Sequence, residues 1–471
     1  MSGPDLPTDA ELADAVARWL PAQRWFGAKT HAITGARVVV RRDFAAPEPG
    51  TIVWLLVEVE LDGAAAQIYQ VPLLVRGALP RHAEHALVPA ALDVTLTDAL
   101  ADPDGALAVA RRVAAGGAEG AIGFQSLRLG WATDIRRVHP LGVEQSNTSV
   151  VLDDHTLLKL FRRIFPGPNP DVEVTAALTT AGCPAVAPLL GSVDLAGFGP
   201  ADTPDAPTTL AMVQEFAANA SDGWQMALNS VRDLMAEGDL LAEEVGSDFA
   251  AETERLGEAI ARVHADLAAA LGTAPLTDPR ARFAALPSQL DEAATVVPAL
   301  ARVRAEVAAI AEAAAREAES SAEVGTLQRI HGDLHLGQAL RTPSGWLLVD
   351  FEGEPSASPA ERRALDHPLR DVAGVLRSLD YAGQHPLMHL TTPSQQLRFR
   401  AAEWTRRNRD AFCTGYAEVA GRDPRSTPAV LRAFEVEKAV YETVYEAQNR
   451  PSWVGLPLRA IEALTAHQGT R

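Results

Sequence analysis

Residues 331–338 read HGDLHLGQ, and the letters DFE follow at 350–352. An enzyme that transfers a phosphoryl group needs one carboxylate that orients or deprotonates the attacking hydroxyl. It also needs two oxygen ligands for a magnesium ion between the phosphates. Asp333 suits the first role, and Gln338 and Asp350 suit the second. These residues predict phosphoryl transfer with Mg²⁺ as a cofactor.

A second chemistry fits the same letters. His331, Asp333 and His335 have the HxDxH spacing of a zinc-dependent hydrolase. Further zinc ligands are not evident, because the other histidines are scattered without paired spacing. A third interpretation places these side chains in an ordinary core without chemistry. We prefer phosphoryl transfer because the zinc site would lack ligands.

Lysine is scarce in this chain. Lys29, Lys159 and Lys438 are the only lysines among 42 basic residues. A chain that uses arginine almost throughout keeps lysine mainly where a compact ammonium cannot be replaced by a planar guanidinium. The three lysines are therefore candidates for function, with survival by chance as the alternative for each.

The composition excludes several classes of protein. The 471 residues are 47% hydrophobic and 22% charged, as in globular proteins, and at about 150 residues per domain they predict roughly three compact units. The net charge of −19 opposes binding to nucleic acid or to anionic membranes. We therefore expect a soluble multi-domain protein that binds neither nucleic acid nor membrane.

The cysteines and the N-terminus favour a cytoplasmic protein. Cys183 and Cys413 are far apart and form no CxxC pair, so neither a disulfide scaffold nor a zinc ribbon is encoded. The N-terminus carries acids where a signal peptide needs positive charge, and no apolar run reaches the roughly 18 residues of a spanning helix. Export and membrane insertion are both disfavoured.

The first part of the chain predicts strands. Thr8 and Glu11 have capping-box spacing ahead of a helix that ends near Leu20. Residues 51–60 and 66–75 alternate or are rich in branched side chains, with a turn between them. Residues 149–152 and 156–161 predict a second hairpin. Residues 199–207 contain four Gly or Pro residues and predict a loop.

The second part predicts helices. After residue 216 apolar residues recur at helical spacing, and Ala-rich helical sequence continues to about Ala322. One pair of strands, 326–330 with 346–351, interrupts this part before helices resume. A β-rich part followed by a mainly helical part predicts the α+β class.

The chemical motif resembles a known superfamily. HGDLHLGQ and VDFEGEP, at 349–355, resemble the catalytic and metal loops of aminoglycoside phosphotransferases and choline kinases, which share a eukaryotic protein-kinase-like fold. Four further motifs in the same order resemble actinobacterial maltokinases from about residue 15 to 465: QRWFGAK at 23–29, EQSNTS at 144–149, LLKLFRR at 157–163 and VYETVYEAQNRPSW at 440–453.

The resemblance implies a bilobal kinase-like fold with three segments. Residues 1–90 would form an N-terminal cap subdomain, and residues 91–215 an intermediate subdomain that completes the β-rich N-lobe. Residues 216–471 would form the mainly helical C-lobe with the catalytic loop and the sugar site. ATP would bind in the cleft between the lobes.

The nucleotide site follows from the same resemblance. Lys159, on the second strand of the hairpin, would neutralise the α- and β-phosphates of ATP. We prefer Glu173 as its ion-pair partner over Asp171. The phosphate loop has no glycine, so Ser146, Asn147 and Thr148 would donate hydrogen bonds instead. Kinases bind adenine through the backbone of a hinge, which the resemblance places at Gln214, Glu215 and Phe216.

The sugar site is expected on a helix over 434–449. Lys438, Tyr441, Glu442 and Tyr445 fall at i, i+3, i+4 and i+7, and Trp453 follows. Flat rings stack on sugars while charged groups bind hydroxyls; a core stripe with a polar edge is the alternative. We also expect these residues at the substrate: His331, His335, Glu352 and Arg370. Asp371 resembles the buried aspartate that supports the catalytic loop, and Trp25, Phe26 and Lys29 would pack the cap.

The resemblance implies a maltokinase that converts ATP and maltose to ADP and maltose 1-phosphate. Asp333 would accept the proton of the anomeric C1 hydroxyl. Maltokinases act beside trehalose synthase in the route from trehalose to α-glucan, so that enzyme is the implied partner. One alternative is a kinase for another sugar, such as glucosamine or glucose. The other is a nucleotide-binding partner protein without activity.

Overall fold

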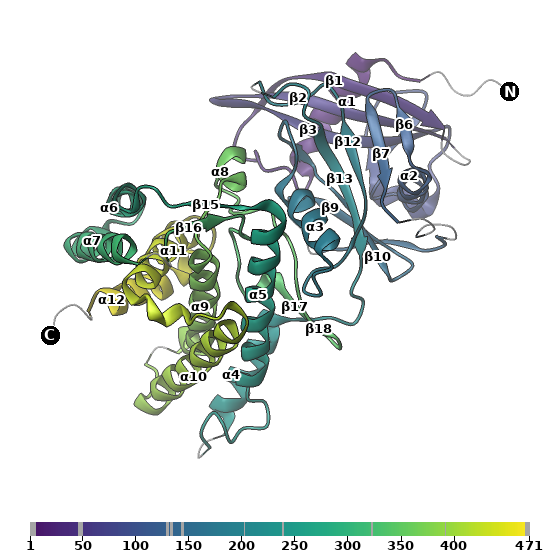
Figure 1. Cartoon of the computed structure of the whole chain (residues 1–471). Helices are drawn as coiled ribbons and strands as arrows, with labels where there is room; N and C mark the ends of the chain where they lie inside the picture. Colours follow the sequence, from purple (N-terminus) through teal and green to yellow (C-terminus); the bar gives the residue numbers. More distant parts are fainter. Residues whose placement is uncertain are drawn as a thin grey trace. The chain divides into compact units, whose positions relative to one another are not determined.

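The computed structural model describes residues 6–45, 50–128, 131, 135–142, 146–201, 203–237, 240–321, 324–390 and 392–466. The chain divides into a first unit, Met1–Ala176 with Ala187–Ala218, and a second unit, Ala177–Val186 with Asn219–Arg471. Strands dominate the first unit and helices dominate the second (Figure 1). The predicted α+β, kinase-like fold class is confirmed.

The first unit begins with the predicted helix and hairpin. Helix α1 (Asp9–Trp19) starts at the predicted capping box, in which Thr8 N donates to Glu11 Oε2 over 2.8 Å. A six-stranded sheet follows, with the order β1-β2-β3-β5-β4 and with β11 paired to β3. Its strands are β1 (Ile33–Ala45), β2 (Thr51–Leu61), β3 (Ala64–Arg76), β4 (Leu87–Val88), β5 (Thr95–Asp98) and β11 (Arg163–Ile164). The sequence did not predict β1, an edge strand that is mostly half-buried.

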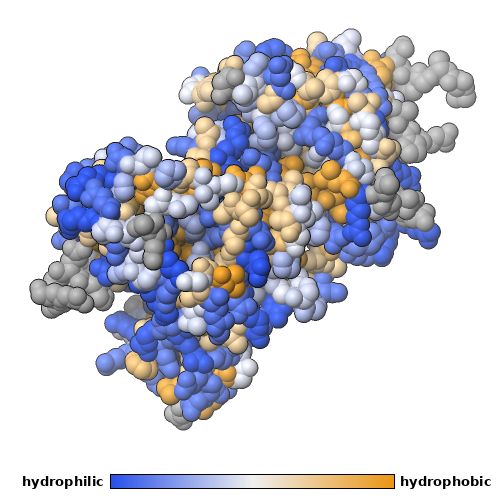
Figure 2. Space-filling model, viewed as in Figure 1, coloured by the Kyte–Doolittle hydropathy of each residue, from blue (hydrophilic) through white to orange (hydrophobic). Residues whose placement is uncertain are grey.

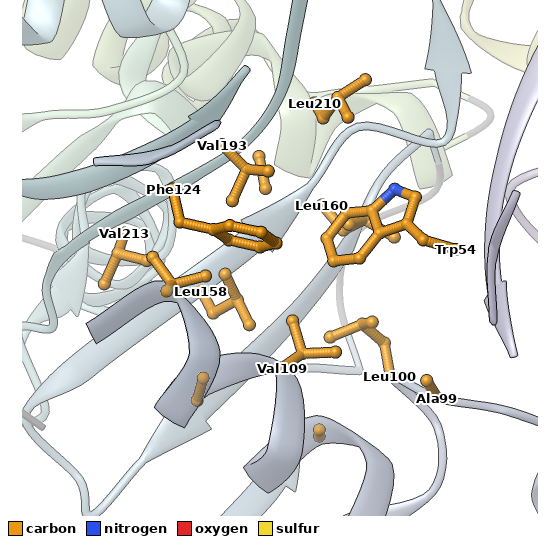
Figure 3. Packing of buried hydrophobic residues seen from close by; sticks show 14 of the residues in the cluster. Trp54, Ala99, Leu100, Val109, Phe124, Leu158, Leu160, Val193, Leu210 and Val213 are labelled. Atoms are coloured by element: carbon orange, nitrogen blue, oxygen red, sulfur yellow. The ribbon is translucent and has the colours of Figure 1, made fainter. Parts of the chain in front are cut away.

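Both faces of this sheet are buried, which explains why β2 lacks a polar face. Val53, Leu55 and Val57 pack with α1 in one hydrophobic cluster. The alternate residues Ile52 and Trp54 belong to a second cluster, with helix α2 (Pro103–Ala115) and the second sheet. Trp54 points toward the same space as Phe124 and Leu160 in Figure 3. Two fully buried faces produce the near-continuous apolar run.

The second sheet of the first unit carries four of the predicted nucleotide residues: Thr148, Lys159, Gln214 and Glu215. Its seven strands have the order β6-β7-β12-β13-β10-β9-β8. They are β6 (Gly117–Glu119), β7 (Ile122–Ser126), β8 (Val138–Pro140), β9 (Thr148–Leu152), β10 (Thr156–Leu160), β12 (Leu189–Leu195) and β13 (Thr208–Glu215). The predicted hairpin is β9–β10, in which Lys159 lies opposite Ser149. Helix α3 (Pro170–Ala181) follows β11.

The second unit consists mainly of helices. They are α4 (Gly223–Ala236), α5 (Ala250–Leu271), α6 (Pro279–Val296), α7 (Arg304–Ser320), α8 (Pro359–Arg363), α9 (Leu369–Gln384), α10 (Gln395–Ala420), α11 (Pro428–Asn449) and α12 (Gly455–Ala466). Short 3₁₀ turns separate several of them: η3 (Pro298–Val303), η4 (Leu336–Gln338), η5 (His385–His389), η6 (Pro424–Ser426) and η7 (Pro451–Trp453). Helix α11 contains the predicted helix over 434–449.

The predicted strand pair of this unit is wrong. Strand β16 (Thr326–Gln328) pairs with β15 (Thr273–Pro275), whereas β18 (Gly345–Leu348) pairs with β17 (Ala339–Thr342). Strand β14 (Ser221–Asp222) completes the sheet β14-β17-β18. The hairpin β17–β18 turns at residues 343–344, and Gly345, the first residue of β18, has φ of +150°. Strand β18 stops before Asp350, whose φ of +67° is incompatible with a strand.

Two further expectations concern the surface. The described residues of the segment 199–207 form no helix or strand, as predicted. Among the described residues, no helix combines the length and the apolar character that a membrane span requires. The face drawn in Figure 2 is mainly hydrophilic, with hydrophobic residues in smaller patches.

Candidate active site

Asp371, on the first turn of α9, holds the backbone of the HGDLH loop. Its Oδ2 accepts the backbone N–H of His331 at 2.7 Å, and its Oδ1 accepts that of Gly332 at 2.9 Å. Gly332 has φ of +84°, which a residue with a Cβ adopts only under strain. Burial raises the pKa of Asp371, but the hydrogen bond from His264 and nearby positive charge outweigh it, so the pKa is lowered. The predicted structural role of Asp371 is confirmed.

His331 is engaged inside the fold. Its ring is buried, its Nε2 lies 2.9 Å from the Val349 carbonyl, and its Nδ1 accepts the Asp333 N–H at 3.3 Å. These partners assign the proton to Nε2, which donates to Val349. The ring centroid lies 4.7 Å from that of Phe351. His331 therefore joins the HGDLH loop to the segment after β18, whereas we had expected it at the substrate.

Asp333 is paired with Lys438 of α11. The Lys438 Nζ lies 2.8 Å from Asp333 Oδ1 and 2.9 Å from Glu354 Oε1, and 4.7 Å from the centre of the Tyr441 ring. Burial alone would lower the pKa of Lys438, but the charges of Asp333 and Glu354 outweigh burial and raise it. Lys438 is therefore a charged ammonium between two carboxylates.

Glu354 is a site residue that the sequence did not single out. Its Oε2 lies 3.2 Å from an Arg370 nitrogen, and another nitrogen of Arg370 lies 2.9 Å from Asp366 Oδ2. Arg370 therefore supports Glu354, whereas we had expected it at the substrate. Burial lowers the pKa of Arg370, but the charges of Glu354, Glu437 and Asp366 raise it overall. The position of Glu354 in VDFEGEP, two residues after Glu352, was the available signal.

The predicted metal ligands lie together. Gln338 Nε2 donates to Asp350 Oδ2 over 3.2 Å, which brings an amide and a carboxylate to one place. Asp350 has φ of +67°, a strained conformation that turns its side chain out of the strand direction. A hard cation such as Mg²⁺ prefers oxygen ligands of these two types. The donor set therefore fits the expected cation. Glu352, which we expect at the substrate, lies two residues after Asp350 and is the next acid along the chain.

His335 lies beside the same loop. Its Nδ1 accepts the Gly337 N–H at 3.0 Å and caps η4. Burial lowers the pKa of His335, with the charge of Asp333 opposing the shift. A lowered pKa keeps the imidazole neutral at pH 7, so Nε2 carries the proton and can donate a hydrogen bond.

A pocket of about 410 Å³ opens at Asp333 within the second unit. Seven predicted residues line it: Asp333, His335, Lys438, Tyr441, Glu442, Tyr445 and Trp453. Residues that the sequence did not single out also line it: Asp222, Trp224, Gln225, Ser378, Tyr381, Glu446 and Arg450. Among the described lining residues, His331, Glu352 and Arg370 do not occur. The predicted stripe of α11 therefore faces a cavity that other helices complete.

Two carboxylates further along α11 from Lys438 also line the pocket. Glu442 pairs with the buried Arg377 at 2.9 Å, and Glu446 Oε1 pairs with Arg450 at 2.8 Å. Burial is the main cause that raises the pKa of both carboxylates. In the described part of the chain, Glu446 Oε2 and the Tyr381 hydroxyl are buried without a hydrogen-bond partner. The carboxylate oxygen of Glu446 can only accept a hydrogen bond, whereas the Tyr381 hydroxyl can donate or accept one.

In the first unit, Lys159 is buried and pairs with Asp171. The distance from Nζ to Asp171 Oδ2 is 2.9 Å. From the sequence we prefer Glu173 as the ion-pair partner of Lys159 and give Asp171 as the alternative, and the structure shows the pair with Asp171. Asp171 precedes Glu173 on the first turn of α3, and its own N–H is fixed by Asn169 Oδ1 at 2.8 Å. This hydrogen bond fixes the backbone of Asp171, the residue whose side chain pairs with Lys159 of β10.

The predicted phosphate loop is tied to the cap sheet by Arg162. Arg162 Nε donates to Thr148 Oγ1 over 2.7 Å, and another nitrogen pairs with Asp98 at the end of β5. The guanidinium also lies 4.4 Å from the centre of the Trp25 ring. Ser146 precedes the buried Asn147, which leads into β9. Glu144 and Gln145 of the motif lie outside the described residues.

The hinge segment ends β13. Gln214 pairs with Leu157 of β10 and Leu189 of β12. The Glu215 N–H donates to the Pro188 carbonyl at 3.0 Å, and the Phe216 N–H donates to the His155 carbonyl at 2.8 Å. Both N–H groups already donate hydrogen bonds within the first unit. If these two residues bind adenine through their backbone, they would therefore do so through their carbonyl groups.

Comparison with known proteins assigns two separate parts of the chain to known families. Residues 19–102 match the maltokinase N-terminal cap domain, and residues 212–421 match the phosphotransferase enzyme family. A glucosamine kinase of Mycolicibacterium smegmatis is 29% identical over 350 residues, covering 71% of this chain and 82% of that relative. A glucosamine kinase of Streptacidiphilus jiangxiensis is 32% identical over 328 residues, covering 67% and 70%.

A solved structure extends the likeness to the whole fold. A glucosamine kinase in complex with glucosamine, ADP and inorganic phosphate covers 98% of this chain and 100% of its own, with a TM-score of 0.69 and 25% identity. The fold and the HGDLH loop define a kinase-like phosphotransferase with an N-terminal cap. The chain belongs to the phosphotransferase enzyme family.

Proposed function

We propose that this phosphotransferase transfers the γ-phosphoryl group of ATP to the anomeric C1 hydroxyl of maltose. The observation that carries the proposal is the pocket of about 410 Å³ with Asp333 at its wall and aromatic rings around it. Rings that stack on sugar faces, together with carboxylates that accept from hydroxyls, are typical of carbohydrate sites. The products would be maltose 1-phosphate and ADP.

Asp333 would orient the C1 hydroxyl and accept its proton as the oxygen attacks the phosphorus. The bond from that oxygen to phosphorus forms while the bond to the ADP oxygen breaks, so ADP leaves with the electron pair. Lys159, with donors from Ser146, Asn147 and Thr148, would neutralise the phosphates. Gln338 and Asp350 would hold Mg²⁺, which when bound supplies positive charge to the phosphate oxygens.

Maltose rather than a single hexose is supported by the spread of the aromatic rings. Tyr441 and Tyr445 are stacked with centroids 6.3 Å apart, next to Lys438 and hence to Asp333. A second group forms around His385, whose ring lies 6.1 Å from Trp224 and 5.2 Å from Trp453. One pyranose ring would leave one of these groups uncovered, whereas a disaccharide offers a ring to each.

Glucosamine is a second candidate, and one observation favours it. Glu446 Oε2 is a buried carboxylate oxygen without a partner in the described part of the chain. An ammonium group would pair with it more strongly than a hydroxyl does. The two relatives and the solved structure named above are glucosamine kinases. A cytoplasmic location and trehalose synthase as a partner stay predictions.

Phosphorus NMR of the products tests the proposal. The enzyme is offered ATP, Mg²⁺ and, in separate reactions, maltose, glucose or glucosamine. A sugar phosphate whose phosphorus couples to the anomeric proton of maltose supports the proposal. If glucosamine is phosphorylated in preference to maltose, maltose is not the substrate. If no sugar phosphate forms, the protein is not a kinase of these sugars. Glu446→Gln should reduce glucosamine turnover more than maltose turnover if the ammonium pairs there.

A further inference from the structure

We infer that Lys438 is a positioning residue for phosphoryl transfer: it holds one oxygen of Asp333 so that the other oxygen faces the acceptor hydroxyl. The inference rests on the proposed function, because it assigns Asp333 to the acceptor. We had expected Lys438 to bind sugar, and its contacts point to Asp333 instead.

The geometry divides the two oxygens of Asp333. Oδ1 accepts from Lys438 Nζ at 2.8 Å, whereas Oδ2 has no hydrogen-bond partner within the described residues. A carboxylate rotates freely about its last bond unless a contact fixes one oxygen. The Lys438 contact removes that freedom, so Oδ2 is the oxygen available to the sugar.

Lys438 is itself held in place. Its side chain is 13% exposed, rises from the middle of α11 and lies along the Tyr441 ring. The ammonium donates a second hydrogen bond to Glu354 Oε1 over 2.9 Å. An ammonium has three protons, so one stays available for the ligand while two are fixed.

Glu354 is braced from the other side. Arg370 of α9 binds Glu354 Oε2, and Arg370 in turn is paired with Asp366. The series Asp333, Lys438, Glu354, Arg370 and Asp366 alternates in charge and connects the HGDLH loop to α11 and α9. Asp333 is therefore positioned by the packing of two helices, and the flexibility of its own loop matters less.

A simpler role is charge compensation. Asp333 and Glu354 each place an oxygen within 3 Å of the same nitrogen, so they would repel each other without Lys438. A second substitution, at Glu354, distinguishes charge compensation from the positioning of Asp333. Removing the charge of Glu354 relieves repulsion, but it leaves Asp333 without the contact that fixes Oδ1.

Lys438→Met tests the inference, because methionine keeps the length of the side chain and removes the charge. We expect kcat to fall about 10- to 100-fold, the loss of one charge-assisted hydrogen bond, with the KM for ATP within twofold of wild type. Lys438→Met/Glu354→Gln should recover the melting temperature but not kcat. A kcat within twofold of wild type in either variant overturns the inference.

A double-mutant cycle shows whether Lys438 acts through Asp333. Lys438→Met should cause no more than a twofold further loss of kcat in an Asp333→Asn background, because the group that it positions is already disabled. A loss as large as in the wild-type background would show that Lys438 acts elsewhere, and overturns the inference.

The contact can also be tested without activity. The chain has three lysines, so the ¹⁵N spectrum of the lysine ammonium groups should contain at most three signals. The signal absent from Lys438→Met belongs to Lys438, and it should shift in Asp333→Asn while the Lys29 signal does not. An unchanged Lys438 signal overturns the inference even if sugar kinase activity is found. A shifted signal in a protein that phosphorylates no sugar supports the contact and removes only the proposed function.

Discussion

Two buried cations hold predicted site residues, one in each unit, and they do so by different means. Arg162 in the first unit binds Thr148 and one carboxylate, that of Asp98, among the described residues. Lys438 in the second unit binds two carboxylates, those of Asp333 and Glu354. Burial lowers the pKa of Arg162 overall, since Asp98 does not offset it, whereas the two carboxylates raise the pKa of Lys438.

The difference matches the chemistry of the two side chains. A guanidinium is planar, stacks on aromatic rings and spreads its donors, so Arg162 can rest on Trp25 and also reach Thr148. An ammonium is a compact charge, which suits a position shared by two carboxylates. The first unit therefore fixes its loop by shape and stacking, and the second fixes its acid by charge.

The largest expected effect is on the second unit. Asp333→Asn should lower kcat by at least about 100-fold, because the amide can orient the hydroxyl but cannot accept its proton. The affinity for ATP should stay within twofold of wild type, since Asp333 is assigned to the acceptor. Steady-state kinetics with the acceptor found by NMR, and calorimetry with ATP, measure the two quantities. A large loss of ATP affinity would contradict the division of work between the units.

Arg162→Met tests the first unit. It leaves Asp98 buried without its cation, so the free energy of unfolding should fall by about 3 to 5 kcal/mol. Loss of the contact to Thr148 should also raise the KM for ATP without changing the KM for the acceptor. Urea unfolding and steady-state kinetics measure these effects.

Two control variants separate the causes. Arg162→Met/Asp98→Asn should recover part of the stability, because no unpaired charge remains, while the KM for ATP stays raised. Arg81→Met replaces an exposed arginine of the same unit and should change neither quantity by much. Equal destabilisation by Arg81→Met would mean that the burial of Arg162 is not the cause.

The sequence predicted what is local in the chain. The hairpin with Lys159, the helix over 434–449 and the supporting role of Asp371 follow from short motifs or from the 3.6-residue period. Asp333, Gln338 and Asp350 were singled out as candidates because they lie within 18 positions of one another. In each case the relevant neighbours are close in sequence.

The sequence could not predict contacts that only tertiary packing creates. Asp222, Trp224 and Tyr381 reach the pocket from parts of the chain that carry no motif. Thr326–Gln328 pairs with residues about 50 positions earlier, which no periodicity indicates. Lys438 was found by its rarity, but its partners Asp333 and Glu354 lie 105 and 84 positions away. The type and spacing of residues identify a candidate site residue, whereas the residues that it contacts depend on the fold.

Low pH should destabilise the second unit, because it contains a buried neutral imidazole, that of His367. His367 lies against Phe434, accepts the Leu369 N–H at 3.1 Å, and burial is the main cause that lowers its pKa to about 4. The unfolded chain takes up this proton near pH 6.5 and the folded chain only near 4. Stability is therefore complete above about pH 6.5 and is lost as the pH falls toward 4, by about 3 kcal/mol.

Urea unfolding between pH 4 and 7 measures this loss. His367→Asn can still accept the Leu369 N–H but does not titrate, so its stability should depend less on pH by that amount. Equal pH dependence in wild type and variant would assign the acid loss to other groups. Asp333 and Lys438 are intact in the variant, so kcat at pH 7 serves as the control for the site.

The smallest effect is expected from Tyr445, at the exposed edge of the pocket. The residue is 41% exposed, and its ring stacks on that of Tyr441. Tyr445→Ala should raise the KM for maltose about 3- to 10-fold, as expected for the loss of one stacking contact, and leave the KM for ATP unchanged. Glucosamine, whose single ring would bind on the same side as Asp333, should lose about as much as maltose. A loss for maltose alone would mean that Tyr445 contacts the second ring of maltose, and that the His385 and Trp453 group does not.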